Sequence, residues 1–189
     1  MKFEELNEKQ QAKAIDEHRY INVEDFIWND FLYEDLQSKM KEYGFDDITI
    51  SADTSFCQGS GASFTCDNID IEKYLRKTKQ YTKYRKLHQL IKDKDLTGTI
   101  ERISHRYNHS NTVDCNLVVS YNIDITTVQD DLVGELQQDI IDYVRGECDE
   151  WHKVLENHYL NLTSDDAVKE TIIANEYDFE IADPEVTYL

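Results

Sequence analysis

The sequence predicts an α+β fold in which antiparallel β-hairpins pack with about four helices, including a long amphipathic helix near the C-terminus. Two patterns support this class. Apolar residues alternate with polar ones in short segments around two turns, and they recur every three or four residues in longer segments. The composition also favours a folded chain, because 40% hydrophobic and 11% aromatic residues exceed what disordered acidic chains usually contain.

A single domain is expected over residues 1–189. This length is sufficient to bury a core, and the one proline and six glycines form no linker-like stretch. Residues 1–20 are expected to hold a loosely attached polar helix, from Phe3 to about Glu17. Residues 177–189 are expected to form a tail that adds an edge strand or stays mobile.

The first amphipathic segment is a helix expected over about 23–43, with Asn22 as its cap and Gly44 as its end. Residues 48–50 and 62–66 then alternate between apolar and polar on either side of a glycine-rich turn. This pattern predicts the first hairpin.

Helical spacing returns over about 69–93, and a second hairpin is expected from 98–107 and 113–121. In the first strand of that hairpin, one face is expected to carry Ile103, His105 and Tyr107. The longest helical pattern covers 127–159, and Ser164 is expected to cap a last short helix, followed by two acids in its first turn.

The net charge of −19 is unevenly distributed along the chain. Residues 1–70 carry −10, residues 71–106 carry +7, and residues 107–189 carry −16. A surface this acidic repels nucleic acid and membrane headgroups, and it attracts basic proteins. Neither direct nucleic-acid binding nor membrane binding is therefore expected.

Four carboxylates follow one another along the long C-terminal helix at spacings of four, four and three residues. We call them the acidic row: Asp131, Glu135, Asp139 and Asp142. Like charges at these spacings lie about 5–6 Å apart and weaken an isolated helix. A basic partner would compensate, so these residues, extended by Asp149 and Glu150, are the candidate partner-binding site. A solvated face that only keeps the protein soluble is the alternative interpretation.

The basic segment, residues 73–86, interleaves lysines and arginines with tyrosines, a composition that suits single-stranded nucleic acid. The excess negative charge elsewhere cancels long-range attraction to nucleic acid. Pairing with the acidic helix, within one chain or across a homodimer, is therefore favoured.

A glycine-rich stretch, Ser55 to Phe64, lacks the spacing of a phosphate-binding loop, and its glycines suit a tight turn. It resembles the S-Q-G-D/S-G-A-S-F stretch of a group of small, acidic, largely uncharacterised phage-encoded proteins. The resemblance continues through residues 105–109, 155–167 and 175–179, and covers about 23–180. Cys57 and Ser60 depart from this pattern, since serine and aspartate are usual there. The resemblance implies a phage origin and, by analogy, an inhibitor of a host protein.

His105 and His109, with Ser55, Ser60 and Ser63, are the candidates for an enzyme or RNA-processing site, because histidine can act as a general base near neutral pH. No carboxylate at a recognisable spacing completes a triad and no third metal ligand accompanies the histidines. We therefore expect no catalytic residue, metal or cofactor. The four cysteines lack CxxC spacing, and with no leader or membrane span expected, the host cytoplasm is the expected location.

The expected function is that of a non-enzymatic, phage-encoded inhibitor. Its acidic surface would imitate DNA and occupy a basic, nucleic-acid-binding host protein, such as a CRISPR defence protein. Two alternatives stay open: an antitoxin-like neutraliser of a basic toxin, and the enzyme based on His105 and His109.

Overall fold

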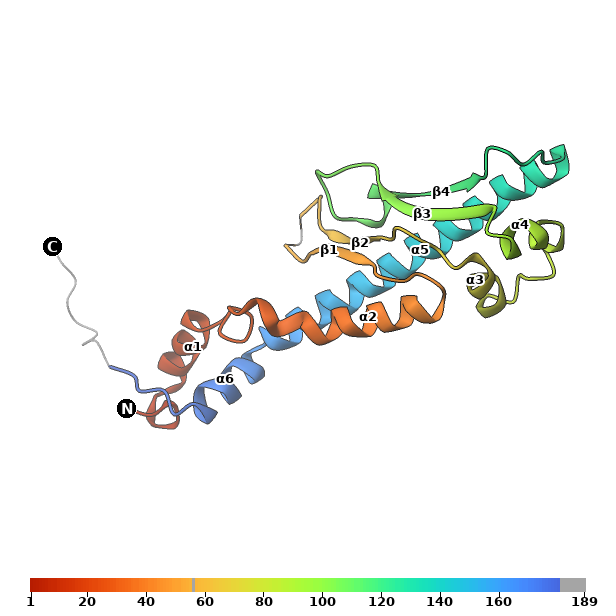
Figure 1. The fold of residues 1–189 in the computed structure, drawn as a ribbon. Coiled ribbons are helices and arrows are strands. Elements are labelled where there is room, and N and C mark those ends of the chain that lie inside the picture. The colour runs from red at the N-terminus through yellow and green to blue at the C-terminus, as the bar shows by residue number, and fades with distance from the viewer. Residues whose placement is uncertain (56, 181–189) are drawn as a thin grey trace. The chain divides into compact units, whose positions relative to one another are not determined.

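The structure is a computed structural model that describes residues 1–55 and 57–180. Its mixed helices and antiparallel hairpins, shown in Figure 1, confirm the predicted α+β class. The chain divides into two compact units. The central unit is Asp30–Glu156, and the terminal unit combines Met1–Asn29 with the chain from Asn157 onward. The single-domain organisation stays a prediction.

Two hairpins form the β layer of the central unit. Strand β1 (Thr49–Asp53) pairs with β2 (Gly61–Thr65), and β3 (Leu96–Arg102) pairs with β4 (Val113–Val119). An isolated antiparallel bridge between Cys66 and Ile100 joins them through two backbone hydrogen bonds of 3.0 and 2.8 Å. The four strands therefore lie in the order β1, β2, β3, β4.

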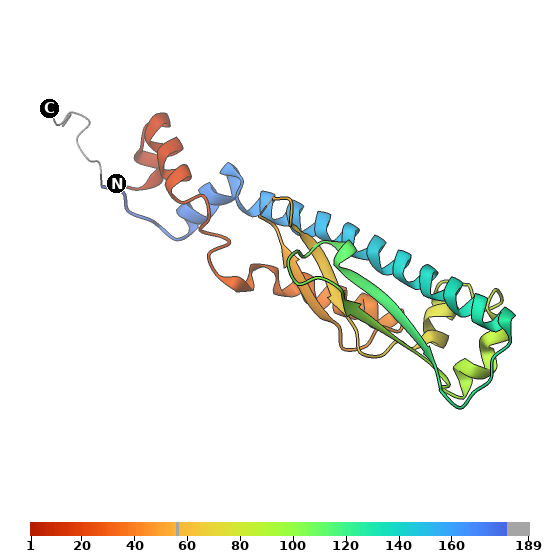
Figure 2. The same cartoon turned by 90° about the horizontal axis from the view of Figure 1, so that it is seen from above.

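Helix α5 (Thr127–Leu162) runs along this β layer (Figure 1, Figure 2). Its side chains also bond two backbone groups on the outer edge of β4. Gln137 Oε1 accepts a hydrogen bond from the Leu117 backbone N–H at 3.1 Å, and the Arg145 guanidinium donates to the Val113 carbonyl at 2.9 Å. These bonds satisfy backbone groups that an edge strand otherwise leaves unpaired.

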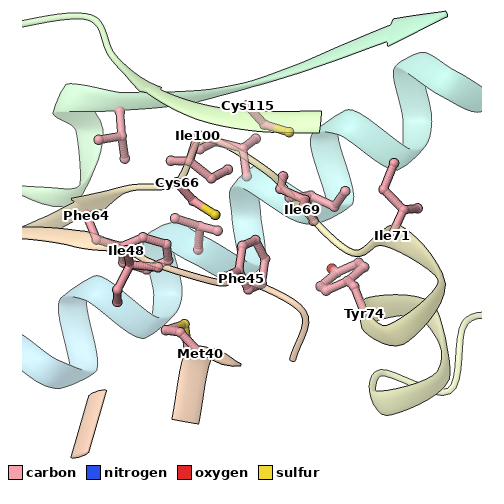
Figure 3. Packing of buried hydrophobic residues seen from close by; sticks show 14 of the residues in the cluster. Met40, Phe45, Ile48, Phe64, Cys66, Ile69, Ile71, Tyr74, Ile100 and Cys115 are labelled. Carbon is pink, nitrogen blue, oxygen red and sulfur yellow. The ribbon is translucent and has the colours of Figure 1, made fainter. Parts of the chain in front are cut away.

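Helix α2 (Asp30–Glu42) packs against α5, where the Trp151 indole N–H donates to the Leu32 carbonyl at 3.3 Å. The core between helices and strands is one contiguous cluster (Figure 3). It includes Met40, Phe45 and Phe64, all at most 1% exposed. The helical and alternating patterns predicted for α2, α5 and both hairpins thus face a common interior.

The prediction of one continuous helical segment over 69–93 is wrong. The chain instead forms α3 (Ile71–Lys77), a 3-10 turn and α4 (His88–Lys92). The break follows Thr78, because Lys79 adopts the left-handed conformation with φ of 60° and the Gln80 N–H bonds back to the Leu75 carbonyl. This chain reversal buries Tyr84 completely, at 0% exposed.

The predicted continuation of β3 to Tyr107 is also wrong. The strand ends at Arg102, whose guanidinium holds the following loop through the carbonyls of Ser104 and Tyr107 and the Asn108 side chain, at 2.7–2.8 Å. Ile103 is 62% exposed, so the expected face of Ile103, His105 and Tyr107 does not form.

The terminal unit contains α1 (Glu8–Glu17) and α6 (Asp165–Ala174). The predicted cap Ser164 accepts from the Ala167 N–H, as expected, and the predicted helix 3–17 is split into a 3-10 turn and α1. A small separate core holds Phe3, Leu6, Ala14, Val168 and Ile172.

The expected cap Asn22 begins no helix, because its side chain bonds Leu162 and Thr171 instead and α2 starts only at Asp30. Within the expected tail 177–189, Phe179 exchanges two backbone hydrogen bonds with Met1. Residues 181–189 lie outside the described part of the chain.

Candidate functional site on helix α5

Helix α5 places the acidic row on its solvent side. Its opposite side is buried, through the residues Val133, Leu136, Ile140, Ile141, Val144, Cys148, Trp151 and Leu155. This burial orients the helix about its axis, so the side chains between the buried positions point away from the core. The predicted row is therefore carried on a fixed surface of the central unit, but its members have different surroundings.

The middle of the row is bound to the basic segment. Lys83 Nζ lies 2.7 Å from an Asp139 carboxylate oxygen and 2.9 Å from a Glu135 oxygen. The Tyr84 hydroxyl donates to the same Asp139 carboxylate at 2.6 Å, and the Tyr74 hydroxyl donates to the Asp139 carbonyl at 3.1 Å. The expected pairing between basic segment and acidic helix thus occurs within the chain at this position.

These contacts shift the pKa values of the side chains that make them. Burial by itself would raise the pKa of Asp139, but hydrogen bonds from Lys83 and Tyr84 outweigh it and hold this pKa below its usual range. Burial and the Asp139 carboxylate raise the pKa of Tyr84 to about 12. Hydrogen bonds to Asp139, Tyr84 and Glu135 raise the pKa of Lys83. The Lys83–Asp139 pair therefore stays charged at neutral pH.

Three other carboxylates form a separate group that we call the acidic line: Asp131, Asp142 and Asp149. All three are exposed, and within the described residues none makes an ion pair. Their spacings of 11 and 7 residues are close to three and two whole helical turns, so they lie along one side of α5, about 16 Å and about 10 Å apart. Asp142 accepts one hydrogen bond from Gln138, at 2.8 Å.

The last predicted partner-binding residue, Glu150, is not free. Lys153 Nζ lies 2.7 Å from its carboxylate, and both side chains are exposed. The neighbouring Glu147 pairs with Lys39 of α2. Of the six predicted residues, the structure thus leaves the acidic line available and occupies Glu135, Asp139 and Glu150.

The basic segment retains free cations. Arg76 pairs with Glu72, and Lys77 pairs with Glu42. In contrast, three exposed cations have no ion pair in the described part of the chain: Lys79, Arg85 and Lys86. The Gln129 side chain donates to the Lys86 carbonyl at 3.2 Å, which places this end of the segment beside the start of α5.

Two glycines lie on the exposed surface of α5. A Cβ atom at Gly134 or Gly146 would meet no atom of the chain within 4 Å. Internal packing therefore does not require glycine at either position, although each costs a helix about 1 kcal/mol relative to alanine.

The glycine-rich turn and the His105–His109 loop do come together. A Cβ at Gly59 would lie 2.5 Å from the Tyr107 ring, and one at Gly61 would lie 2.3 Å from the His109 Cα. The two glycines are thus explained by close packing of the hairpin loops. His105 is exposed, His109 stacks on Tyr107, and the buried His109 Nδ1 has no hydrogen-bond partner among the described residues.

The serines of this turn surround Cys57, which is exposed whereas the other three cysteines are buried. The Ser55 and Ser60 hydroxyls lie 3.1 and 3.5 Å from its sulfur. Hydrogen bonds from Ser55, Ser60 and the Gly59 backbone lower the pKa of Cys57 to about 7. The single Ser55 hydroxyl proton also faces Asp53 at 3.0 Å, so it is shared among several acceptors. Ser63 is buried away from this group, against Thr112.

Neither metal-binding clusters nor membrane-spanning helices are found in the portion of the chain that the structure describes. No three His, Cys, Asp or Glu residues there are arranged to hold a metal ion. No helix there is long and apolar enough to cross a bilayer.

The comparisons with known proteins identify a family without a described activity. No curated protein and no solved structure matches the chain. Residues 28–165 match the family described as a domain of unknown function, DUF8835. This match covers most of the chain, including the central unit from Asp30 to Glu156 and the whole acidic row. The chain belongs to the DUF8835 family.

Proposed function

We propose that this protein is a non-enzymatic inhibitor that binds a basic, nucleic-acid-binding partner through the acidic line of α5. The observation that carries the proposal is the exposure of Asp131, Asp142 and Asp149 on one side of a helix whose other side is buried in the core. Each carboxylate is free to pair with a partner lysine or arginine. The sequence resemblance to phage-encoded proteins makes a host protein the expected partner.

The spacing of the acidic line favours separate ion pairs over close imitation of a phosphate backbone. The line places three charges along about 27 Å of helix, whereas the same length of duplex DNA carries about 16 phosphates. The overall charge of −19 supplies the long-range attraction to a basic cleft, and the acidic line supplies the local contacts.

Affinity purification from cells that express the protein, followed by mass spectrometry, tests this proposal. The bait is compared with a variant that carries Asp131→Lys, Asp142→Lys and Asp149→Lys. We expect a basic nucleic-acid-binding protein to be retained by the unmodified bait at low salt and lost from the variant. The control reverses two exposed acids of α2, Glu34→Lys and Asp35→Lys.

Competition then separates the proposed mechanism from other binding. The purified partner should bind either its nucleic acid or this protein, and the affinity for this protein should fall steeply with salt. A partner that binds the triple variant as tightly as the unmodified protein, or that binds both ligands at once, contradicts the proposal.

A further inference from the structure

The acidic line and the free cations of the basic segment are oppositely charged surfaces of one compact unit. Both belong to the central unit, Asp30–Glu156. The acidic line is exposed and unpaired, as are Arg85 and Lys86 among the described residues. Lys83 already pairs with α5 carboxylates, which shows that the two surfaces suit each other chemically.

The chain cannot complete this pairing by itself. Lys83 fixes the basic segment beside Asp139, and the contact of Lys86 with Gln129 directs the segment toward the start of α5. Asp149 lies twenty residues beyond Gln129, about 30 Å along the helix. A lysine or arginine side chain reaches much less than this distance, so Arg85 and Lys86 cannot reach Asp149 of the same chain.

We propose that the occupant of the acidic line in the absence of another partner is the basic segment of a second copy of this chain. In an arrangement about a two-fold axis, Asp142 and Asp149 of each copy meet Arg85 and Lys86 of the other, and every contact is made twice.

Salt should affect this dimer in two opposite ways. At low ionic strength the long screening length lets two chains of charge −19 repel each other over their whole surfaces. At about 0.15 M salt the screening length falls to about 8 Å, so the local complementary contacts dominate. At about 1 M these contacts are screened as well. The dimer population is therefore expected to pass through a maximum at intermediate salt.

The test uses two variants of the full chain in sedimentation velocity, over a concentration series reaching high micromolar. One variant carries Asp142→Lys and Asp149→Lys, and the other carries Arg85→Glu and Lys86→Glu. Each is expected to raise the dimer dissociation constant at least tenfold. An equimolar mixture should restore a dimer that contains one copy of each, because both interfaces then pair opposite charges. Native mass spectrometry with one variant isotopically labelled identifies this mixed dimer.

Two control variants exclude effects of net charge alone: Glu34→Lys with Asp35→Lys, and Lys41→Glu with Lys92→Glu. Both change exposed residues outside the two surfaces and should leave the dimer constant unchanged. A monomer under all salt conditions, a dimer that both charge reversals leave intact, or mixed variants that stay monomeric would each overturn the proposal. The measurement needs no foreign partner, so its failure is separate from failure of the proposed inhibitory function.

Discussion

The two parts of the acidic surface on α5 have opposite surroundings although their residues alternate in the sequence. Asp139 is held by Lys83 and Tyr84, whereas Asp142, three residues later, bonds only Gln138 of its own helix among the described residues. The first carboxylate is a structural residue that anchors the basic segment. The second is a surface charge that the fold does not use. Spacing along a helix therefore identifies which carboxylates are neighbours, but not which of them are free.

The largest contrast should come from removing each carboxylate in turn. Asp139→Ala leaves the Tyr84 hydroxyl and the Lys83 ammonium without their acceptor, and we expect the free energy of unfolding to fall by about 2 kcal/mol. Asp142→Ala should change it by less than about 0.5 kcal/mol. Urea denaturation followed by circular dichroism measures both.

A double-mutant cycle sharpens this comparison. If Tyr84 acts through Asp139, then Tyr84→Phe combined with Asp139→Ala should cost less than the sum of the single changes. Equal losses for Asp139→Ala and Asp142→Ala would show that the two carboxylates are equivalent after all.

A substitution on the exposed side of α5 should stabilise the protein, whereas Asp139→Ala destabilises it. Because nothing surrounds the Cβ position of Gly146, Gly146→Ala is expected to raise the free energy of unfolding by about 1 kcal/mol. Thermal unfolding checks this gain. The control is Gly44→Ala, which should destabilise, because φ there is 93° and the new Cβ would lie 2.5 Å from the Asp70 carbonyl oxygen. A loss of stability in both variants would contradict the open surroundings of Gly146.

A smaller effect is expected for the cation of the bound pair. Lys83→Met removes two ion pairs whose lysine is 40% exposed, so the free energy of unfolding should fall by about 1 kcal/mol or less. Lys153→Met removes one exposed pair with Glu150 and should have almost no effect. Denaturant titrations should give a different loss of unfolding free energy at low and high salt for Lys83→Met, and the same result at both salt concentrations for Lys153→Met. A salt-independent loss would indicate packing of the lysine stem rather than charge.

The smallest expected effect is the change with pH in the contribution of Asp139 to the free energy of unfolding. Since the folded-state pKa of Asp139 is lowered, its contribution is present above the unfolded pKa of about 3.9 and is lost as pH falls through the folded pKa. The stability difference between the unmodified protein and Asp139→Asn should therefore be constant from pH 7 to about pH 5 and shrink below about pH 4. A difference that grows on acidification would assign the stabilisation to the protonated carboxyl.

The sequence predicted the α+β class, both hairpins, and helix α5 because these follow from local periodicity. It could not divide residues 69–93 correctly, because the reversal at Lys79 places a lysine in a conformation that favours glycine. Tyr84 was predicted only as part of a basic, aromatic segment, and no local pattern shows that its hydroxyl meets Asp139. The candidate site was thus located on the right helix, but its free and occupied residues depend on contacts between distant segments.

The two hydrogen bonds of Gln137 and Arg145 to the β4 edge bear on how this protein resists aggregation. A chain of charge −19 is kept apart from its copies by repulsion at low salt, but that protection weakens as ions screen it. The Leu117 N–H and the Val113 carbonyl, which these side chains bond, are withheld from a strand of another molecule whatever the ionic strength. Even where its charges are screened, this edge of β4 therefore has fewer unpaired backbone groups with which another strand could bond.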